Sequence, residues 1–211
     1  MFWRLSHSKK VKLLYSIEPN AFVMQTNIVW TGIADHSLES CNLIITDNGA
    51  DISSFVSGRH DTCHYEVTYR LKTNRLWETL SLTVQSQLNG AAMFTDLESD
   101  GKGNWLLNGE RNESFTGCID VDISVTAFTN SLPINRLRLR EQASAEIRVL
   151  YIDILEQRIL PVYQKYTKLS KNKYKYENVP NDFEALISVD EAGLVTDYPE
   201  LFKRVNIGKT Q

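Results

Sequence analysis

The sequence predicts a mainly β protein, built as an antiparallel sheet, sandwich or barrel with one principal helix. Three observations predict this class. Apolar and polar residues alternate with a period of two in many short runs, turn signals separate those runs, and helical signals are scarce. More than ten strands, predominantly antiparallel, are therefore expected.

The expected strands follow one another at a spacing of roughly ten residues. The alternation is clearest where Ile119, Val121, Ile123 and Val125 are separated by polar side chains. Similar runs cover residues 43–46, 67–70, 80–84, 145–151, 183–189 and 194–196. Hairpin and turn signals rich in Asn, Asp and Gly stand at 47–49, 89–90, 100–104, 108–109 and 190–193.

The principal helix is expected over residues 129–138. Thr129 or Asn130 provides an N-cap, and Pro133 is tolerated because it falls inside the first turn. Leu132 and Ile134 stand at even-numbered positions, whereas the apolar residues that follow, Leu137 and Leu139, stand at odd-numbered positions. A single strand would therefore place the two pairs on opposite faces, so a helix or a bend is expected between them. A second short helix is predicted after Tyr198 and Pro199, carrying Leu201, Phe202 and Val205.

Length and charge restrict the class of protein. The 211 residues carry 23 Lys and Arg against 26 Asp and Glu, a net charge of −3, so no basic excess supports nucleic-acid binding. A hydrophobic content of 42% is enough for a core. We expect one domain over residues 1–211, with residues 1–10 and 207–211 frayed.

Cysteine usage and the N-terminus indicate a reduced, cytoplasmic setting. Cys41, Cys63 and Cys118 are odd in number, far apart and free of any Cys-x-x-Cys spacing, so no disulfide is expected. Residues 1–10 lack the apolar stretch of a signal peptide, and no run approaches the length of a transmembrane helix.

No motif supports a cofactor, a metal or a nucleophilic triad. The chain has no Gly-x-Gly-x-x-Gly, Walker or Gly-x-Ser-x-Gly pattern, and its four histidines stand in no catalytic arrangement. Residues 100–104 resemble part of a calcium loop but lack its full ligand series and closing Glu. A hairpin turn that ends at Trp105 is the favoured interpretation of this segment.

Two carboxylates on one strand are the main chemical feature. Asp120 and Asp122 lie on the same face, about 7 Å apart at Cα from the ~3.3 Å rise per residue. They could bind sugar hydroxyls or a divalent cation, or carry out acid–base chemistry. They could equally be a solvent face paired with Arg136, Arg138 or Arg140.

Aromatic residues gather in the C-terminal third of the chain. Six tyrosines belong to this group: Tyr151, Tyr163, Tyr166, Tyr174, Tyr176 and Tyr198. Tyrosine rings suit half-buried strands, and the same rings could form a platform for sugar C–H faces or acyl chains.

Several segments together resemble a known family. Residues 117–122, Gly-Cys-Ile-Asp-Val-Asp, and residues 128–137, Phe-Thr-Asn-Ser-Leu-Pro-Ile-Asn-Arg-Leu, are similar to the core motif of a bacterial glycolipid-binding family, formerly a domain of unknown function. Residues 164–167, 174–176 and 189–199 resemble its later blocks, and the likeness spans roughly residues 25–205. Ala127 and Asn135 depart from the pattern, which would have proline and arginine there.

The resemblance implies a large antiparallel, barrel-like curved sheet wrapped around a single helix, assembled as a homodimer. It also implies a remote likeness to lipoprotein localisation factors and an acidic pocket. The candidate ligand-binding residues on the matching blocks are Asp120, Asp122, Asn130, Arg136, Tyr166, Asp190 and Asp197.

Three functions compete at this point. The first is binding of a glycolipid or other amphipathic ligand, with a role in glycolipid or cell-envelope metabolism. Here Asp120 and Asp122 accept hydrogen bonds from sugar hydroxyls, and Arg136 holds a carboxylate or meets an anionic head group. The second is an enzyme on a sugar or lipid, with the acidic pair as acid and base. The third is a structural or regulatory dimer whose pocket is filled by its own helix. Whether the acidic or the apolar face of the strand lines a pocket stays open.

Overall fold

A computed structural model describes residues 23–205, so the expected fraying at both termini lies outside the described residues. Fifteen strands form one large curved sheet that is not closed, in the order β8-β7-β6-β5-β4-β3-β2-β1-β15-β14-β13-β12-β11-β10-β9. All described pairings are antiparallel except that of β9 with β10. The mainly β prediction is confirmed.

The first half of the sheet is a meander in which each strand pairs with the next. Its members are β1 (Val23–Gly32), β2 (Leu38–Thr46), β3 (Gly49–His60), β4 (Cys63–Thr73), β5 (Thr79–Leu88), β6 (Ala91–Ser99), β7 (Trp105–Leu107) and β8 (Glu110–Arg111). Strict alternation between buried and exposed residues, most regular in β4, fixes which side of each strand faces the core.

The second half contains the remaining strands in chain order. They are β9 (Asp120–Ile123), β10 (Ser144–Asp153), β11 (Arg158–Ser170), β12 (Lys173–Val179), β13 (Glu184–Val189), β14 (Val195–Tyr198) and β15 (Phe202–Arg204). The strand expected over residues 119–126 is shorter than predicted. It ends at Ile123, because the chain turns there and Val125 enters the core from that turn.

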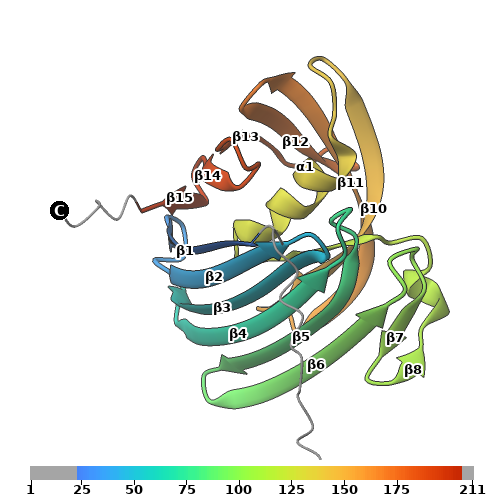
Figure 1. Ribbon diagram of the computed structural model, residues 1–211. Helices are drawn as coiled ribbons and strands as arrows, with labels where there is room; N and C mark the ends of the chain where they lie inside the picture. Colours follow the sequence, from blue (N-terminus) through green and yellow to red (C-terminus); the bar gives the residue numbers. More distant parts are fainter. Residues whose placement is uncertain (1–22, 206–211) are drawn as a thin grey trace, which may run out of the picture.

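One α-helix, α1 (Ser131–Leu137), lies inside the curve of the sheet in the described chain, between the two halves (Figure 1). A short 3-10 turn, η2 (Phe128–Asn130), leads into it, and the 3-10 turn η1 (Glu113–Phe115) precedes β9. Pro133 occupies the first turn of α1, as expected, whereas the N-cap residue Asn130 makes no capping hydrogen bond with its side chain. The helix prediction for residues 129–138 is therefore confirmed.

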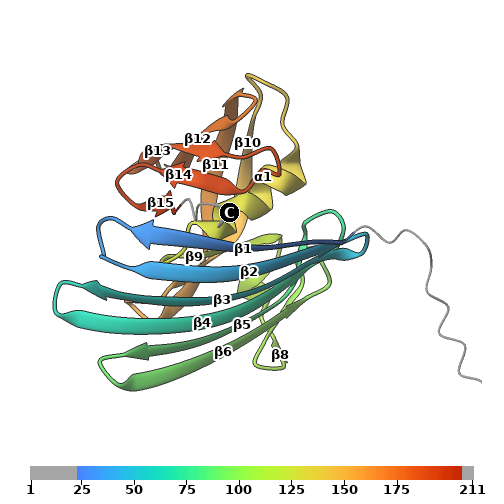
Figure 2. The ribbon, with the colours of Figure 1, turned by 60° about the vertical axis from the view of Figure 1, so that its left-hand side comes forward.

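The second predicted helix is wrong, because residues 202–204 form strand β15. The edge of β1 supplies the pairing, with Trp30 opposite Arg204 and Gly32 opposite Phe202. Figure 2 shows β15 and β14 directly above β1, where the two halves of the sheet meet. A long-range pairing partner thus overrides the local helical spacing of Leu201, Phe202 and Val205.

The two free edges of the sheet, β8 and β9, are neighbours in sequence, and the chain between them bridges the gap. The backbone N–H of Gly117 donates to the carbonyl of Gly103 at 2.9 Å, and the indole N–H of Trp105 donates to the carbonyl of Cys118 at 2.7 Å. The segment at 100–104 is the predicted hairpin turn, in which the Asp100 carboxylate accepts the backbone N–H of Lys102 and Asn104.

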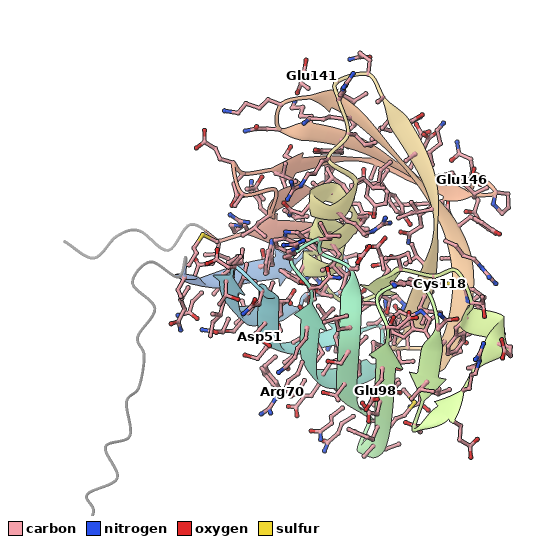
Figure 3. All side chains as sticks on the ribbon, turned by 45° about the vertical axis from the view of Figure 1, so that its right-hand side comes forward. Asp51, Arg70, Glu98, Cys118, Glu141 and Glu146 are labelled. Carbon is pink, nitrogen blue, oxygen red and sulfur yellow. The ribbon has the colours of Figure 1, made fainter. Side chains whose placement is uncertain are left out.

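The core fills the space between the sheet and the η2–α1 segment, while charged residues cover the outside. Trp30 and Phe128 meet edge to face in this core, with ring centroids 6.5 Å apart. Asp51 and Arg70 extend from the opposite side of the sheet, away from α1 (Figure 3).

Cys41, Cys63 and Cys118 are free thiols in the described chain. Among the described residues, no helix is long and apolar enough to cross a membrane.

Candidate functional site

A cavity of about 450 Å³ opens between the turn after β9, the strands β11 and β12, and the β14–β15 end of the sheet. This volume lies in the range of ordinary small-molecule sites. Its polar lining consists of Asp122, Ser124, Thr126, Asn130, Gln164 and Asn178, and its aromatic lining of Tyr151, Tyr163, Tyr176, Phe183, Tyr198 and Phe202. The cavity therefore combines hydrogen-bonding groups with an apolar wall.

Asp122 is the central polar group of this cavity. The hydroxyl of Thr129 donates to its Oδ1 at 2.8 Å, and the amide Nε2 of Gln164 donates to its Oδ2 at 2.7 Å. The hydroxyl of Thr129 in turn accepts the backbone N–H of Ile123, which ties the 3-10 turn to β9. Burial raises the pKa of Asp122, and the two hydrogen bonds oppose that rise.

Asn130 and Tyr166 form a second polar unit. The hydroxyl of Tyr166 donates to Oδ1 of Asn130 at 2.9 Å. Asn130 lines the cavity, whereas Tyr166 is buried behind the wall. Tyr166 therefore orients the Asn130 amide, whose nitrogen forms no hydrogen bond within residues 23–205.

The aromatic wall is continuous. Tyr198 lies within 6.2 to 6.4 Å of Tyr176, Phe183 and Phe202, measured between ring centroids. Burial raises the pKa of Tyr176 and Tyr198, and that of Tyr151 to about 12. Their hydroxyls thus stay protonated at neutral pH and can both donate and accept.

Apolar side chains at the mouth of the cavity are open to solvent. Tyr163, Val179 and Phe183 retain 49%, 37% and 40% of their surface exposed. Exposed apolar surface next to a cavity is typical of a site that receives an apolar ligand.

Asp120 is held in a different way from Asp122. It is completely buried and accepts hydrogen bonds from two nitrogens of Arg136, with Nη2 to Oδ2 at 2.5 Å and Nε to both oxygens at 3.0 and 3.1 Å. This fork joins β9 to α1, and neither residue lines the cavity. Of the two alternatives for the acidic pair, arginine pairing therefore applies to Asp120, and Asp122 faces the cavity.

Asp190 and Asp197 lie away from the cavity. Asp190 accepts the backbone N–H of Ala192 and Leu194 and pairs with Arg204 at 2.6 Å, which fixes the turn between β13 and β14. Asp197 is half-buried on β14 and does not line the cavity. The structure thus brings Asp122, Asn130 and Tyr166 together and leaves these two acids apart.

Sequence reasoning missed part of the site. Gln164, Asn178, Phe183 and Phe202 gave no signal of their own, because amide and phenylalanine side chains occur in any half-buried strand. Of the tyrosine cluster, Tyr151, Tyr163, Tyr176 and Tyr198 do line the cavity, whereas Tyr174 packs under Lys168 elsewhere.

A buried carboxyl group behind the cavity was also missed. Glu39, on β2, is 1% exposed and accepts hydrogen bonds from Ser54 and Tyr69 at Oε1 and from Thr126 at Oε2, all at 2.6 to 2.7 Å. Burial raises its pKa. Since Thr126 lines the cavity, Glu39 anchors that part of the wall to the first half of the sheet.

No group of three or more His, Cys, Asp or Glu side chains that could hold a metal ion occurs among residues 23–205. The cavity is lined by neutral polar groups, aromatic rings and one carboxylate, a set that suits hydrogen bonding and stacking.

Comparison with known proteins agrees with this arrangement. A family model described as "Putative glycolipid-binding" matches residues 27–204. A crystal structure of a DUF1089 family protein from Pseudomonas aeruginosa is similar, with a TM-score of 0.70 and 29% identity over 96% of this chain and 100% of the other. None of the curated proteins compared with the chain matches it.

Proposed function

The chain belongs to the glycolipid-binding family, and on that premise we propose that its cavity holds an amphipathic ligand that carries a sugar. The observation that carries this proposal is the division of the cavity into a polar part and an apolar mouth. Asp122, Asn130 and Gln164 supply hydrogen-bonding groups to the lining, and Tyr163 and Phe183 are aromatic lining residues that are open to solvent.

The polar part suits a sugar. Carboxylate and amide oxygens accept hydrogen bonds from hydroxyl groups, and amide N–H groups donate to them. The rings of Tyr176, Tyr198 and Phe202 offer flat faces beside these groups, against which sugar C–H faces pack. The acyl chain then leaves through the mouth.

Asp120, Arg136 and Tyr166 have supporting positions in this proposal. The Asp120–Arg136 fork fixes β9 against α1, and Tyr166 orients Asn130. Asp190 and Asp197 take no part in ligand contact. The proposed setting is glycolipid or cell-envelope metabolism.

An enzyme that uses two acids is less well supported. Asp120 is neutralised by Arg136 and lies outside the cavity, so Asp122 is the sole carboxylate on the lining. Acid–base hydrolysis of a glycoside commonly needs two carboxyl groups across the bond.

The test is extraction and mass spectrometry of lipids that co-purify with the protein, together with calorimetric titration of octyl glucoside. Val162→Phe narrows the cavity from β11 and should abolish both the extracted lipid and the titration. Leu38→Phe, at an exposed site on β2, is the matched control and should retain both. Lipid-free protein that binds no glycoside would contradict the proposal, and release of free sugar would favour the enzyme.

A further inference from the structure

The charge of the cavity is unbalanced. Asp122 is the one charged side chain among the residues that line it, and neither Lys nor Arg contributes to the lining. The remaining polar groups are hydroxyls and amides. A ligand that enters this cavity therefore meets one acidic side chain and no basic side chain.

Three buried or half-buried aspartates of the described chain have cationic partners, whereas the buried Glu39, which does not line the cavity, is held by three hydroxyl donors. Asp120 pairs with Arg136 at 2.5 Å, Asp190 with Arg204 at 2.6 Å and Asp153 with Arg158 at 3.2 Å. Within residues 23–205 Asp122 has only the neutral donors Thr129 and Gln164. A carboxylate that is removed from water without a cation is destabilised, and a cationic ligand would offset that cost.

Asp122 also has room for more donors. An ionised carboxylate offers about four acceptor sites on its two oxygens, and Thr129 and Gln164 occupy two of them. The rings of Tyr176 and Tyr198, 6.2 Å apart, stand in the same cavity. Aromatic faces attract cations through their quadrupole, so the wall and the carboxylate favour the same kind of group.

We infer that the head group of the ligand carries a protonated amine next to its hydroxyls, as an amino sugar does, and that anionic head groups are rejected. This inference rests on the proposed function and specifies the ligand class of the same cavity. A phosphate or carboxylate would place like charges together in a partly dehydrated site.

The dependence on pH follows from the groups that face Asp122. They are Asp120, which is paired with Arg136, and the phenols Tyr151, Tyr166, Tyr176 and Tyr198, whose pKa values are all raised. Because those phenols stay neutral, Asp122 is the group that titrates as the medium becomes acidic. Amine binding should therefore weaken at low pH, whereas binding of a neutral sugar should not.

The experiment compares three octyl glycosides of equal chain length by calorimetry: a glucoside, a 2-amino-2-deoxyglucoside and a glucuronide. At a pH where Asp122 is ionised and the amine is protonated, the amine should bind about tenfold more tightly than the glucoside, because a charged hydrogen bond replaces a neutral one. The glucuronide should bind most weakly. On further acidification, the advantage of the amine should disappear.

Asp122→Asn should bind the amine and the neutral glucoside equally. Asp51→Asn is the control, since it removes the same charge from the outer side of β3 and should keep the preference (Figure 3). An amine that binds wild-type protein no better than the glucoside, or a glucuronide that binds best, would overturn the inference while leaving the proposed function intact. If none of the three binds, the proposed function itself fails. The pH series on the wild-type protein needs no variant, so it tests the inference even if the Asp122→Asn protein does not fold.

Discussion

Three buried or half-buried carboxyl groups, those of Glu39, Asp120 and Asp122, have three different sets of hydrogen-bond partners. Asp120 has a guanidinium partner, Glu39 has three hydroxyl donors, and Asp122 has an amide, a hydroxyl and an open side toward the cavity. The sequence could place Asp120 and Asp122 on one strand face. It could not distinguish them, because their different partners come from α1, η2 and β11, which only the fold brings together.

The Asp120–Arg136 pair should be important for stability. Asp120→Asn leaves the Arg136 guanidinium, 17% exposed, without its counter-charge, so the free energy of unfolding should fall by about 3–5 kcal/mol. Urea unfolding measures this. Asp51→Asn, which removes an exposed pair with Lys72, should cost at most about 1 kcal/mol. Equal losses in the two variants would contradict a structural role for the buried pair.

Glu39 should make stability depend on pH. Burial raises its pKa above the ordinary value of 4.5, so the folded state holds this proton more tightly than the unfolded state does. Its contribution to stability is therefore greatest below pH 4.5 and is lost as the pH rises through the folded-state pKa. Glu39→Gln removes the titration. The unfolding free energy of wild type minus that of Glu39→Gln should fall across this window, and a constant difference would refute the assignment.

At the scale of elements, the alternation of period two predicted most strands because it reflects a sheet with one covered side. The alternating burial of side chains along β4 and β5 could be predicted from this period. Strand β15 was not, because three residues show no period and their strand conformation depends on β1. The end of β9 was misjudged for a related reason, since Val125 is buried by a turn and not by the strand.

The bridge between the two sheet edges depends on Gly103. A Cβ at this position would lie 2.8 Å from the Cα of Gly117, and its φ of +89° is strained for other residues. Gly103→Ala should lower the free energy of unfolding by roughly 2–5 kcal/mol from backbone strain plus the clash.

Gly109→Ala is the matched control. Its φ of +83° carries the same strain, but nothing lies within 4 Å of an added Cβ, so about 1–2 kcal/mol is expected in thermal or urea unfolding. A loss for Gly103→Ala no larger than that for Gly109→Ala would show that the close approach to Gly117 is unimportant.

For the whole molecule, we predict a homodimer, as the family likeness implies. Residues 91–95 of β6 pair only with β5 in the described chain, since β7 covers residues 97–99, and Phe94 among them is 55% exposed. An uncharged free edge favours association with another strand. Light scattering should report a mass near twice 24.2 kDa, and Phe94→Lys should reduce it. A mass equal to that of the monomer for the wild-type protein would contradict the prediction of a dimer.

The pairing of β1 with β15 has a consequence for how the protein is made. It joins Thr31 to Lys203, 172 residues apart, whereas nearly every other strand pairs with its immediate successor. On the ribosome, the β1–β8 meander emerges first and can form from local contacts. The edge of β1 then stays unpaired until the last strand has been synthesised. During that time it can pair with another nascent chain. A chain that stops before Phe202 should therefore aggregate, although most of its sheet is intact.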